Sequence, residues 1–327
     1  MPNFATMRRC AWMAIALVAA AGVTQVSFAQ TYPNRVIKII VPFAVGGQPD
    51  TVARVFAQHL AMTVGPTIVD NRPGNNTTLG AKAAASADPD GYTLLFGSST
   101  SLAIAPAITA NAGYDPVKSF APIVAISSSP MFLTVGPSVP AKTIAEFVAH
   151  AKANPGKLNF ASPSGGPPHL SGEMFKRAVG IDIVPVFYRT MNQAITDLLA
   201  GQMDIVFDSP APLAHLLREG KIRALVSLSA KRSPQLADVP TMAESGLPDL
   251  QVTTWNGLVA PAGTPAAIIV RLNAAINDAL KSPDIRETLS RFSSDPIGGT
   301  PQQFADFIVV ESKKWAETIR LAGVKVE

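Results

Sequence analysis

The residues best suited to chemistry in this sequence lie in a glycine-rich turn, PFAVGGQPD (42–50). The turn follows the apolar run RVIKIIV (35–41) and leads into a helical pattern. Gly46 and Gly47 can both adopt positive φ and let a ligand approach the main chain closely. The helix expected to begin near Pro49 presents unpaired N–H groups and the positive end of its dipole to this turn. The turn can therefore hold a phosphate or a carboxylate, or it can be a tight corner.

Hydroxyl side chains occupy the same kind of position after other predicted strands. Ser98 and Ser99 follow YTLLFG (92–97), and Ser162 and Ser164 stand between a predicted strand and the next helix. Ligands of open α/β sheets bind at the carboxyl ends of strands, so these side chains are candidate ligand contacts. Hydroxyls and helix N-termini together suit a carboxylate or another small oxyanion.

Sequence patterns typical of catalysis are missing. There is no GxSxG, no HExxH, and no metal-ligand spacing among the four histidines. GNNTTLGAK (74–82) approaches a P-loop, but it has one residue too many between its glycines, and Ala81 stands before Lys82. The sequence therefore favours a binding protein without a cofactor or metal, although a hydrolase or isomerase on a similar scaffold stays open as an alternative.

The N-terminus has the pattern of a secretory signal. Arg8 and Arg9 precede the apolar stretch AWMAIALVAAAGV, and the small residues SFA precede Gln30. The apolar stretch is shorter than the ~20 residues that a membrane span needs. We therefore expect a signal peptide over residues 1–29, cleavage after Ala29, and export to the periplasm.

The remaining chain is close to neutral. Without Arg8 and Arg9, 25 of the 27 basic residues face 23 acidic ones, which is a net charge of about +2. This charge is too small for a nucleic-acid-binding protein. The single cysteine, Cys10, lies within the expected signal, so the exported chain has no disulfide or thiolate metal site. About 298 residues suffice for one large or two medium domains.

Short β-rich runs alternate with amphipathic stretches along the chain, which indicates parallel sheets covered by helices. Two long extended runs, 120–136 and 252–265, look like crossings between lobes. The division expected from them is lobe 1 over 30–130 and 254–327, and lobe 2 over 131–253. The other strands are expected at 35–41, 66–71, 92–97, 157–162, 183–188, 203–208 and 222–229.

Many segments of the chain, in order, resemble the Bug family, the periplasmic solute receptors of tripartite tricarboxylate transporters. The matching segments are PFAVGGQPDTVAR (42–54), VDNRPG (69–74), DPDGYTLLFG (88–97), YDPVKSFAPI (114–123), NPGKLNFAS (154–162), LLAGQMDIVFD (198–208), GKIRALVSLSAKRSPQLADVPTMAESG (220–246) and WNGLVAPAGTP (255–265). The resemblance implies a type II periplasmic-binding-protein fold, with two α/β lobes joined by two crossing strands around a ligand cleft. It also implies a small carboxylate ligand, no enzymatic activity, and membrane transporter subunits as partners. We expect a monomer.

The resemblance also implies roles for individual residues. Amides and hydroxyls of the first glycine turn, of the turn after YTLLFG and of the ASPSGG turn (161–166) are expected to hold a carboxylate, partly through water. Asp208 is expected to organise the other end of the ligand or a bound water, and Tyr188 lies near the same cleft. The anion-holding residues are Phe43, Gly46, Gly47, Ser98, Ser99, Ser162 and Ser164.

Several departures from the family pattern fall on these turns. Ala44 and Val45 replace two prolines, and FYRT (187–190) replaces PYKG. The sequence therefore leaves open which acid binds, and whether the receptor serves a transporter, a sensor or a scavenger. A second interpretation of Asp208 also stays open, in which it only adds negative charge near the N-terminus of a helix over 210–218.

Overall fold

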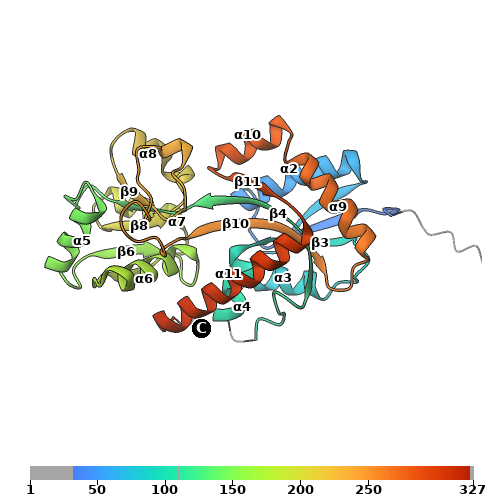
Figure 1. Cartoon of the computed structure of the whole chain (residues 1–327), viewed down its shortest axis with the longest axis horizontal. Coiled ribbons are helices and arrows are strands. Elements are labelled where there is room, and N and C mark those ends of the chain that lie inside the picture. The colour runs from blue at the N-terminus through green and yellow to red at the C-terminus, as the bar shows by residue number, and fades with distance from the viewer. Residues whose placement is uncertain (1–31, 110, 325–327) are drawn as a thin grey trace, which may run out of the picture. The chain divides into compact units, whose positions relative to one another are not determined.

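Figure 1 shows the computed structural model of the protein, which describes residues 32–109 and 111–324. The helices and strands of this part lie in a compact unit that begins at Arg35. The expected signal peptide, its cleavage site and Cys10 lie outside the described residues. Within the described part, no helix is long and apolar enough to cross a bilayer.

A six-stranded sheet with the order β11-β4-β10-β3-β1-β2 forms the first lobe. β1 pairs in parallel with β2 and β3, while β10 runs antiparallel to both β3 and β4. The strands are β1 (Ile37–Val41), β2 (Thr67–Asn71), β3 (Thr93–Ser98), β4 (Phe120–Pro130), β10 (Thr253–Pro261) and β11 (Asp295–Gly298). The helices of this lobe are α2 (Gln48–Thr63), α3 (Thr78–Ala85), the π-helix η1 (Thr100–Ile104), α4 (Ala105–Ile108), α9 (Ala266–Ala279), α10 (Pro283–Arg291) and α11 (Pro301–Ala322).

A five-stranded sheet with the order β7-β6-β8-β5-β9 forms the second lobe. β6 is parallel to β7 and β8, and β5 is antiparallel to β8 and β9. The strands are β5 (Phe132–Val135), β6 (Asn159–Ser162), β7 (Val184–Phe187), β8 (Ile205–Asp208) and β9 (Arg223–Ser227). The helices are α5 (Ile144–Ala153), α6 (Pro167–Val179), α7 (Met191–Leu199), the 3-10 turns η2 (Ala211–Leu213) and η3 (Pro234–Leu236), and α8 (Ala214–Arg218).

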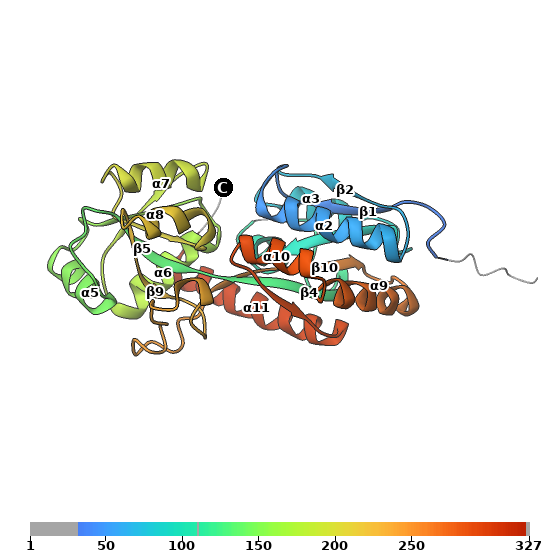
Figure 2. The same ribbon diagram turned by 90° about the horizontal axis from the view of Figure 1, so that it is seen from above.

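The chain passes between the two sheets at the predicted crossings. β4 ends at Pro130 and β5 begins at Phe132, so only Met131 separates a strand of one sheet from a strand of the other. The return begins at Val252, whose N–H bonds to Leu228 of the second lobe at 2.7 Å, and it continues directly into β10. Figure 2 shows β4 and β10 extending together between the lobes.

Three details of the sequence prediction were wrong. β11 was missed because DPIG (295–298) contains a proline, which is tolerated here at a sheet edge where no ladder N–H is needed. The π-helix η1 directly after β3 was also missed. The helix expected over 210–218 is instead a 3-10 turn from Ala211 followed by the short α8.

A buried carboxylate fastens α11 to the first lobe. Both Trp255 Nε1 on β10 and Trp315 Nε1 on α11 donate to Glu311 Oε2, at 2.9 and 3.1 Å, and Lys314 pairs with the other carboxylate oxygen. The C-terminal end of the same helix reaches α6 of the second lobe, where Arg177 Nη1 donates to the Leu321 carbonyl oxygen at 3.3 Å. α11 therefore contacts both lobes beside the crossing strands.

Replacing Glu311 with leucine should lower the free energy of unfolding by about 3 kcal/mol, because two buried indole N–H groups lose their acceptor. Urea denaturation measures this. Glu317→Gln is the matched control, since it breaks an exposed pair with Arg320 on the same helix and should cost under about 0.5 kcal/mol. Equal losses in the two variants would contradict the role assigned to Glu311.

Candidate functional site

Parallel pairing places the predicted site residues at one edge of each sheet. In the first lobe β1 and β3 end next to each other, just before the glycine turn and the Ser98–Ser99 turn respectively. In the second lobe β6, β7 and β8 end at Ser162, Phe187 and Asp208, with Ser162 directly opposite Phe187. The structure thus gathers Phe43, Gly46, Gly47, Ser98 and Ser99 in one lobe, and Ser162, Ser164, Tyr188 and Asp208 in the other.

The two glycines of the first turn differ in conformation. Gly46 has φ +86°, as expected, and its N–H donates to Asp50 Oδ2 at 2.8 Å. Gly47 has φ −74° and ψ 169°, so the expectation of a positive φ there was wrong. Gly47 is the N-cap of α2, and an N-cap residue takes extended backbone angles. Phe43 contributes its carbonyl oxygen, which accepts from Asn71 Nδ2 at 3.1 Å.

The buried carboxylate of Asp50 holds this turn in shape, a role that the sequence analysis missed. Its side chain accepts from Gly46, from Asn71 Nδ2 at 2.9 Å and from Arg54, with which it forms a salt bridge at 3.0 Å. Burial acts to raise the pKa of Asp50, but the hydrogen bonds from Arg54, Gly46 and Asn71 outweigh it and hold the pKa below its usual value. The available signal was an acid in the first helical turn with an arginine four residues later.

The turn after β3 is held by paired serines. The Ser98 N–H donates to Ser101 Oγ at 2.9 Å, and the Ser101 N–H donates to Ser98 Oγ at 3.2 Å. Ser98 therefore shapes the turn with both its amide and its hydroxyl. Ser99 is 2% exposed, and its hydroxyl has no hydrogen-bond partner within the described residues, so it is the freer of the two predicted donors.

The ASPSGG turn (161–166) of the second lobe is held by a histidine. The Gly165 N–H donates to Nδ1 of His169 at 3.1 Å, and burial lowers the pKa of His169, which favours the neutral ring that can accept this bond. Ser164 is exposed at the tip of the turn, whereas the Ser162 hydroxyl is fully buried and lacks a partner within the described part of the chain. The sequence had shown no metal-ligand spacing between His169 and the other histidines, and it gave no role to His169 in holding this turn.

Tyr188 lines an open hollow of about 490 Å³ with Phe187, Arg189, Gln193, Thr196 and Asp197. Its hydroxyl donates to Asp197 Oδ2 at 2.6 Å. Burial, this hydrogen bond and the charge of Asp197 together raise the pKa of Tyr188 to about 12. The hydroxyl is therefore already engaged with Asp197, and Tyr188 offers chiefly its ring to this hollow.

Asp208 is the last residue of β8, and its carboxyl group has a raised pKa. Burial raises the pKa of Asp208 to about 7, although the Ser209 N–H, which donates to Oδ1 at 2.7 Å, acts to lower it. It forms no salt bridge within the described residues, and its partner in the strand register is Phe132. The carboxyl group can therefore be neutral near neutral pH, when it can donate a hydrogen bond as well as accept one.

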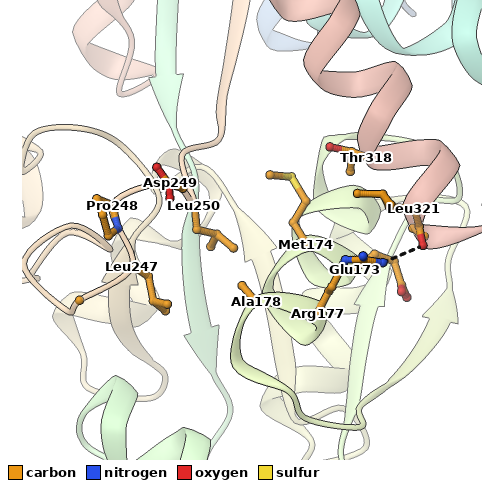
Figure 3. A pocket seen from close by; sticks show the side chains of 12 residues that line it. Glu173, Met174, Arg177, Ala178, Leu247, Pro248, Asp249, Leu250, Thr318 and Leu321 are labelled. Carbon is orange, nitrogen blue, oxygen red and sulfur yellow. Dashed lines mark hydrogen bonds between the residues drawn. The ribbon is translucent and has the colours of Figure 1, made fainter.

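A separate groove of about 470 Å³ lies where α6, the 246–250 loop and the end of α11 meet (Figure 3). Met174, Leu247, Leu250 and Leu321 form much of its wall, and burial raises the pKa of Glu173 at its side. None of the nine predicted site residues lines this groove. It is therefore distinct from the candidate site at the strand ends.

Residues 52–324 match the family model described as "Tripartite tricarboxylate transporter family receptor". The structure is similar to that of the periplasmic binding protein BugD, with 32% identity, a TM-score of 0.77, and coverage of 90% of this chain and 100% of the other. It is also similar to Rpa4515 of R. palustris with adipate (32%, TM-score 0.79, coverage 90% and 99%). MatC of Rhodopseudomonas palustris with bound malate is similar as well (34%, TM-score 0.76, coverage 88% and 100%).

The conformations of the two glycines predict opposite effects on stability when each is replaced with serine. Gly46→Ser should lower the free energy of unfolding by about 1–2 kcal/mol, because a side chain is strained at positive φ. Gly47→Ser should be neutral or stabilising, since serine is a favoured N-cap and a Cβ there would only reach Ala44 O and Pro49 Cδ, both at 3.7 Å. Urea denaturation of both variants tests this, and a larger loss for Gly47→Ser would refute the assignment.

Proposed function

The chain belongs to the tripartite tricarboxylate transporter receptor family, and we propose that it captures a small organic carboxylate between its two lobes for delivery to transporter subunits in the membrane. Its type II periplasmic-binding-protein fold, with two α/β lobes joined by crossing strands, is confirmed by the solved structures that it resembles. The family match also confirms the expectation of a receptor rather than an enzyme.

The observation that carries the proposal is that each lobe starts a long helix at a strand end beside exposed or unpartnered hydroxyls. α2 begins after the glycine turn and α6 begins after the ASPSGG turn. The first N–H groups of a helix have no partner within the helix and attract negative charge, which favours an anion at the turn before α2. α6 begins with Pro167 and Pro168, which have no N–H, so its turn depends on the His169 N–H, the helix dipole and the serine hydroxyls. Similar proteins contain adipate and malate, which are both carboxylates.

In the proposed complex the first lobe supplies most of the anion contacts. The Gly46 N–H is committed to Asp50, so Gly47, the first amides of α2 and the Ser99 hydroxyl hold the carboxylate, directly or through water. Phe43 forms a side of this site. Ser98 contributes by fixing the turn that presents Ser99.

The second lobe supplies the remaining contacts when the lobes approach. The Ser164 hydroxyl is exposed for a ligand, and the buried Ser162 hydroxyl lacks a protein partner. Tyr188 presents its ring, since Asp197 holds its hydroxyl. Asp208 contacts a polar group or water at the other end of the ligand, and in its neutral form it donates a hydrogen bond instead of repelling an anion.

The proposal also covers the lobe boundaries, export and oligomeric state of the protein. The lobes comprise residues 30–130 with 254–327, and 131–253. The family's receptors are periplasmic, and we place cleavage of this chain after Ala29. We further propose that the exported protein is a monomer that binds no nucleic acid.

A screen of mono-, di- and tricarboxylates against protein that has been unfolded and refolded tests the function directly. An acid at 100 times its Kd should stabilise the fold by about 2.7 kcal/mol. At about 2–4 °C per kcal/mol, the melting temperature should rise by about 5–10 °C. If no acid in a broad panel shifts the melting temperature, the carboxylate assignment fails.

The setting of Asp208 predicts pH-dependent binding. For an acid that is fully ionised at both pH 6 and pH 8, affinity should be up to about tenfold higher at pH 6, because the neutral form of a group with a pKa of about 7 predominates there. Titration calorimetry at the two pH values measures the ratio. Asp208→Asn should abolish the difference, since asparagine cannot ionise.

Asp278→Asn is the control for this experiment, because Asp278, near the end of α9, forms an exposed pair with Lys281 and is not among the proposed site residues. This variant should keep the pH dependence of the unmodified protein. A pH dependence that survives in Asp208→Asn, or tighter binding at pH 8, would refute the role of Asp208.

A further inference from the structure

We propose that the site selects an acid with one carboxylate and an apolar body, an aromatic or branched aliphatic monocarboxylate, and that Val45 and Phe187 contact that body. This inference rests on the proposed function and narrows the class of ligand. Three features of the two strand-end edges support it: an exposed aliphatic side chain, an exposed aromatic ring, and the absence of surplus positive charge among the described residues.

The first lobe exposes Val45 at the tip of its anion turn. Val45 is 71% exposed and lies directly before Gly46, whose N–H is fixed by Asp50. Because Asp50 is in turn held by Asn71 and Arg54, the turn presents Val45 in a defined position. An aliphatic side chain that stays in water beside an anion site has surface to bury when a ligand binds.

The second lobe exposes an aromatic ring at the end of one of its strands. Phe187 is 53% exposed at the end of β7, directly opposite Ser162. Its ring and the His169 ring form a T-shaped pair with 4.8 Å between the centroids, and Phe187 also lines the hollow that contains Tyr188. His169 also holds Gly165, so the aromatic ring and the ASPSGG turn are fixed by one residue.

The charges at these edges suit one carboxylate. In the first lobe Arg54 already neutralises Asp50. In the second, Arg189 is exposed and forms no salt bridge within the described residues, but it lines the same hollow as Asp197, whose negative charge offsets it. His169 is buried, and its Nδ1 accepts the Gly165 N–H. A second or third ligand carboxylate would therefore be desolvated without a matching cation, which is unfavourable.

Calorimetry on the refolded protein with defined acids tests the class of ligand. Phenylacetate and isovalerate should bind at least tenfold more tightly than citrate and malate. Tighter binding of citrate or malate would overturn this inference and leave the proposed function intact. Binding of none of the four, nor of any acid in the wider screen, would overturn the proposed function itself.

Substitutions at the two apolar side chains test their role separately. Phe187→Ala and Val45→Ser should each weaken phenylacetate binding severalfold or more, and both should leave acetate binding, followed by ligand-observed NMR, nearly unchanged. Acetate carries the carboxylate without the apolar body, so it reports on the anion contacts alone. Equal losses for acetate and phenylacetate would mean that the substitution had disturbed the turn, and would overturn the contact.

Val184→Ala and Val270→Ala are the matched controls. Val184 is 42% exposed at the other end of β7, and Val270 is 64% exposed in the first half of α9. Neither variant should change the affinity for phenylacetate. Val45→Ser should also fold normally, because this exposed residue packs little against the protein, so a loss of binding in this variant cannot be due to misfolding. Unchanged phenylacetate binding in both Val45→Ser and Phe187→Ala would overturn the inference.

Discussion

The antiparallel pairing of β4 with β10 is the constraint on which both lobes depend. The pairing runs from Phe120 opposite Pro261 to Pro130 opposite Thr253, so the end of β4 leads into the second lobe and the start of β10 leads out of it. The register shifts between Asn256 and Gly257, where a Cβ on Gly257 would lie 2.2 Å from the Phe304 ring. Glycine is therefore required for α11 to pack against this strand, and Trp255 beside it fixes Glu311.

This framework keeps the proposed ligand contacts at the strand ends apart from the large apolar side chains of the core. The large buried side chains, such as Trp255, Trp315 and Phe207, lie within the sheets and the helices that cover them. The turns at the strand ends are stabilised by their own short-range bonds, from Asp50 to Gly46, from Ser101 to Ser98 and from His169 to Gly165. Each turn is thus preorganised before a ligand binds, which lowers the entropic cost of binding.

In the proposed site, main-chain amides and hydroxyls allow the receptor to hold an anion and still release it. A salt bridge buried between lobes requires both charges to be desolvated, and separating it is costly. Helix N-termini contribute only about 0.3–2 kcal/mol each, so their combined attraction falls quickly once the lobes separate. The proposed site follows this pattern, since Asp50, which shapes the first turn, is neutralised by Arg54, and Asp208 can lose its charge near neutral pH.

The sequence by itself determined the alternation of strands and helices, both crossings, and the glycines and hydroxyls at strand ends. These features depend on local periodicity and turn chemistry, which a single sequence displays. Only the tertiary structure decided which hydrogen-bond donors remain available to a ligand. Asn71, 21 residues from Asp50, helps to hold the carboxylate that engages the Gly46 amide, and Asp197 engages the Tyr188 hydroxyl. Desolvation in the folded protein raised the pKa of Asp208. Hydrogen-bond competition and burial depend on residues brought together by folding, and no local pattern encodes them.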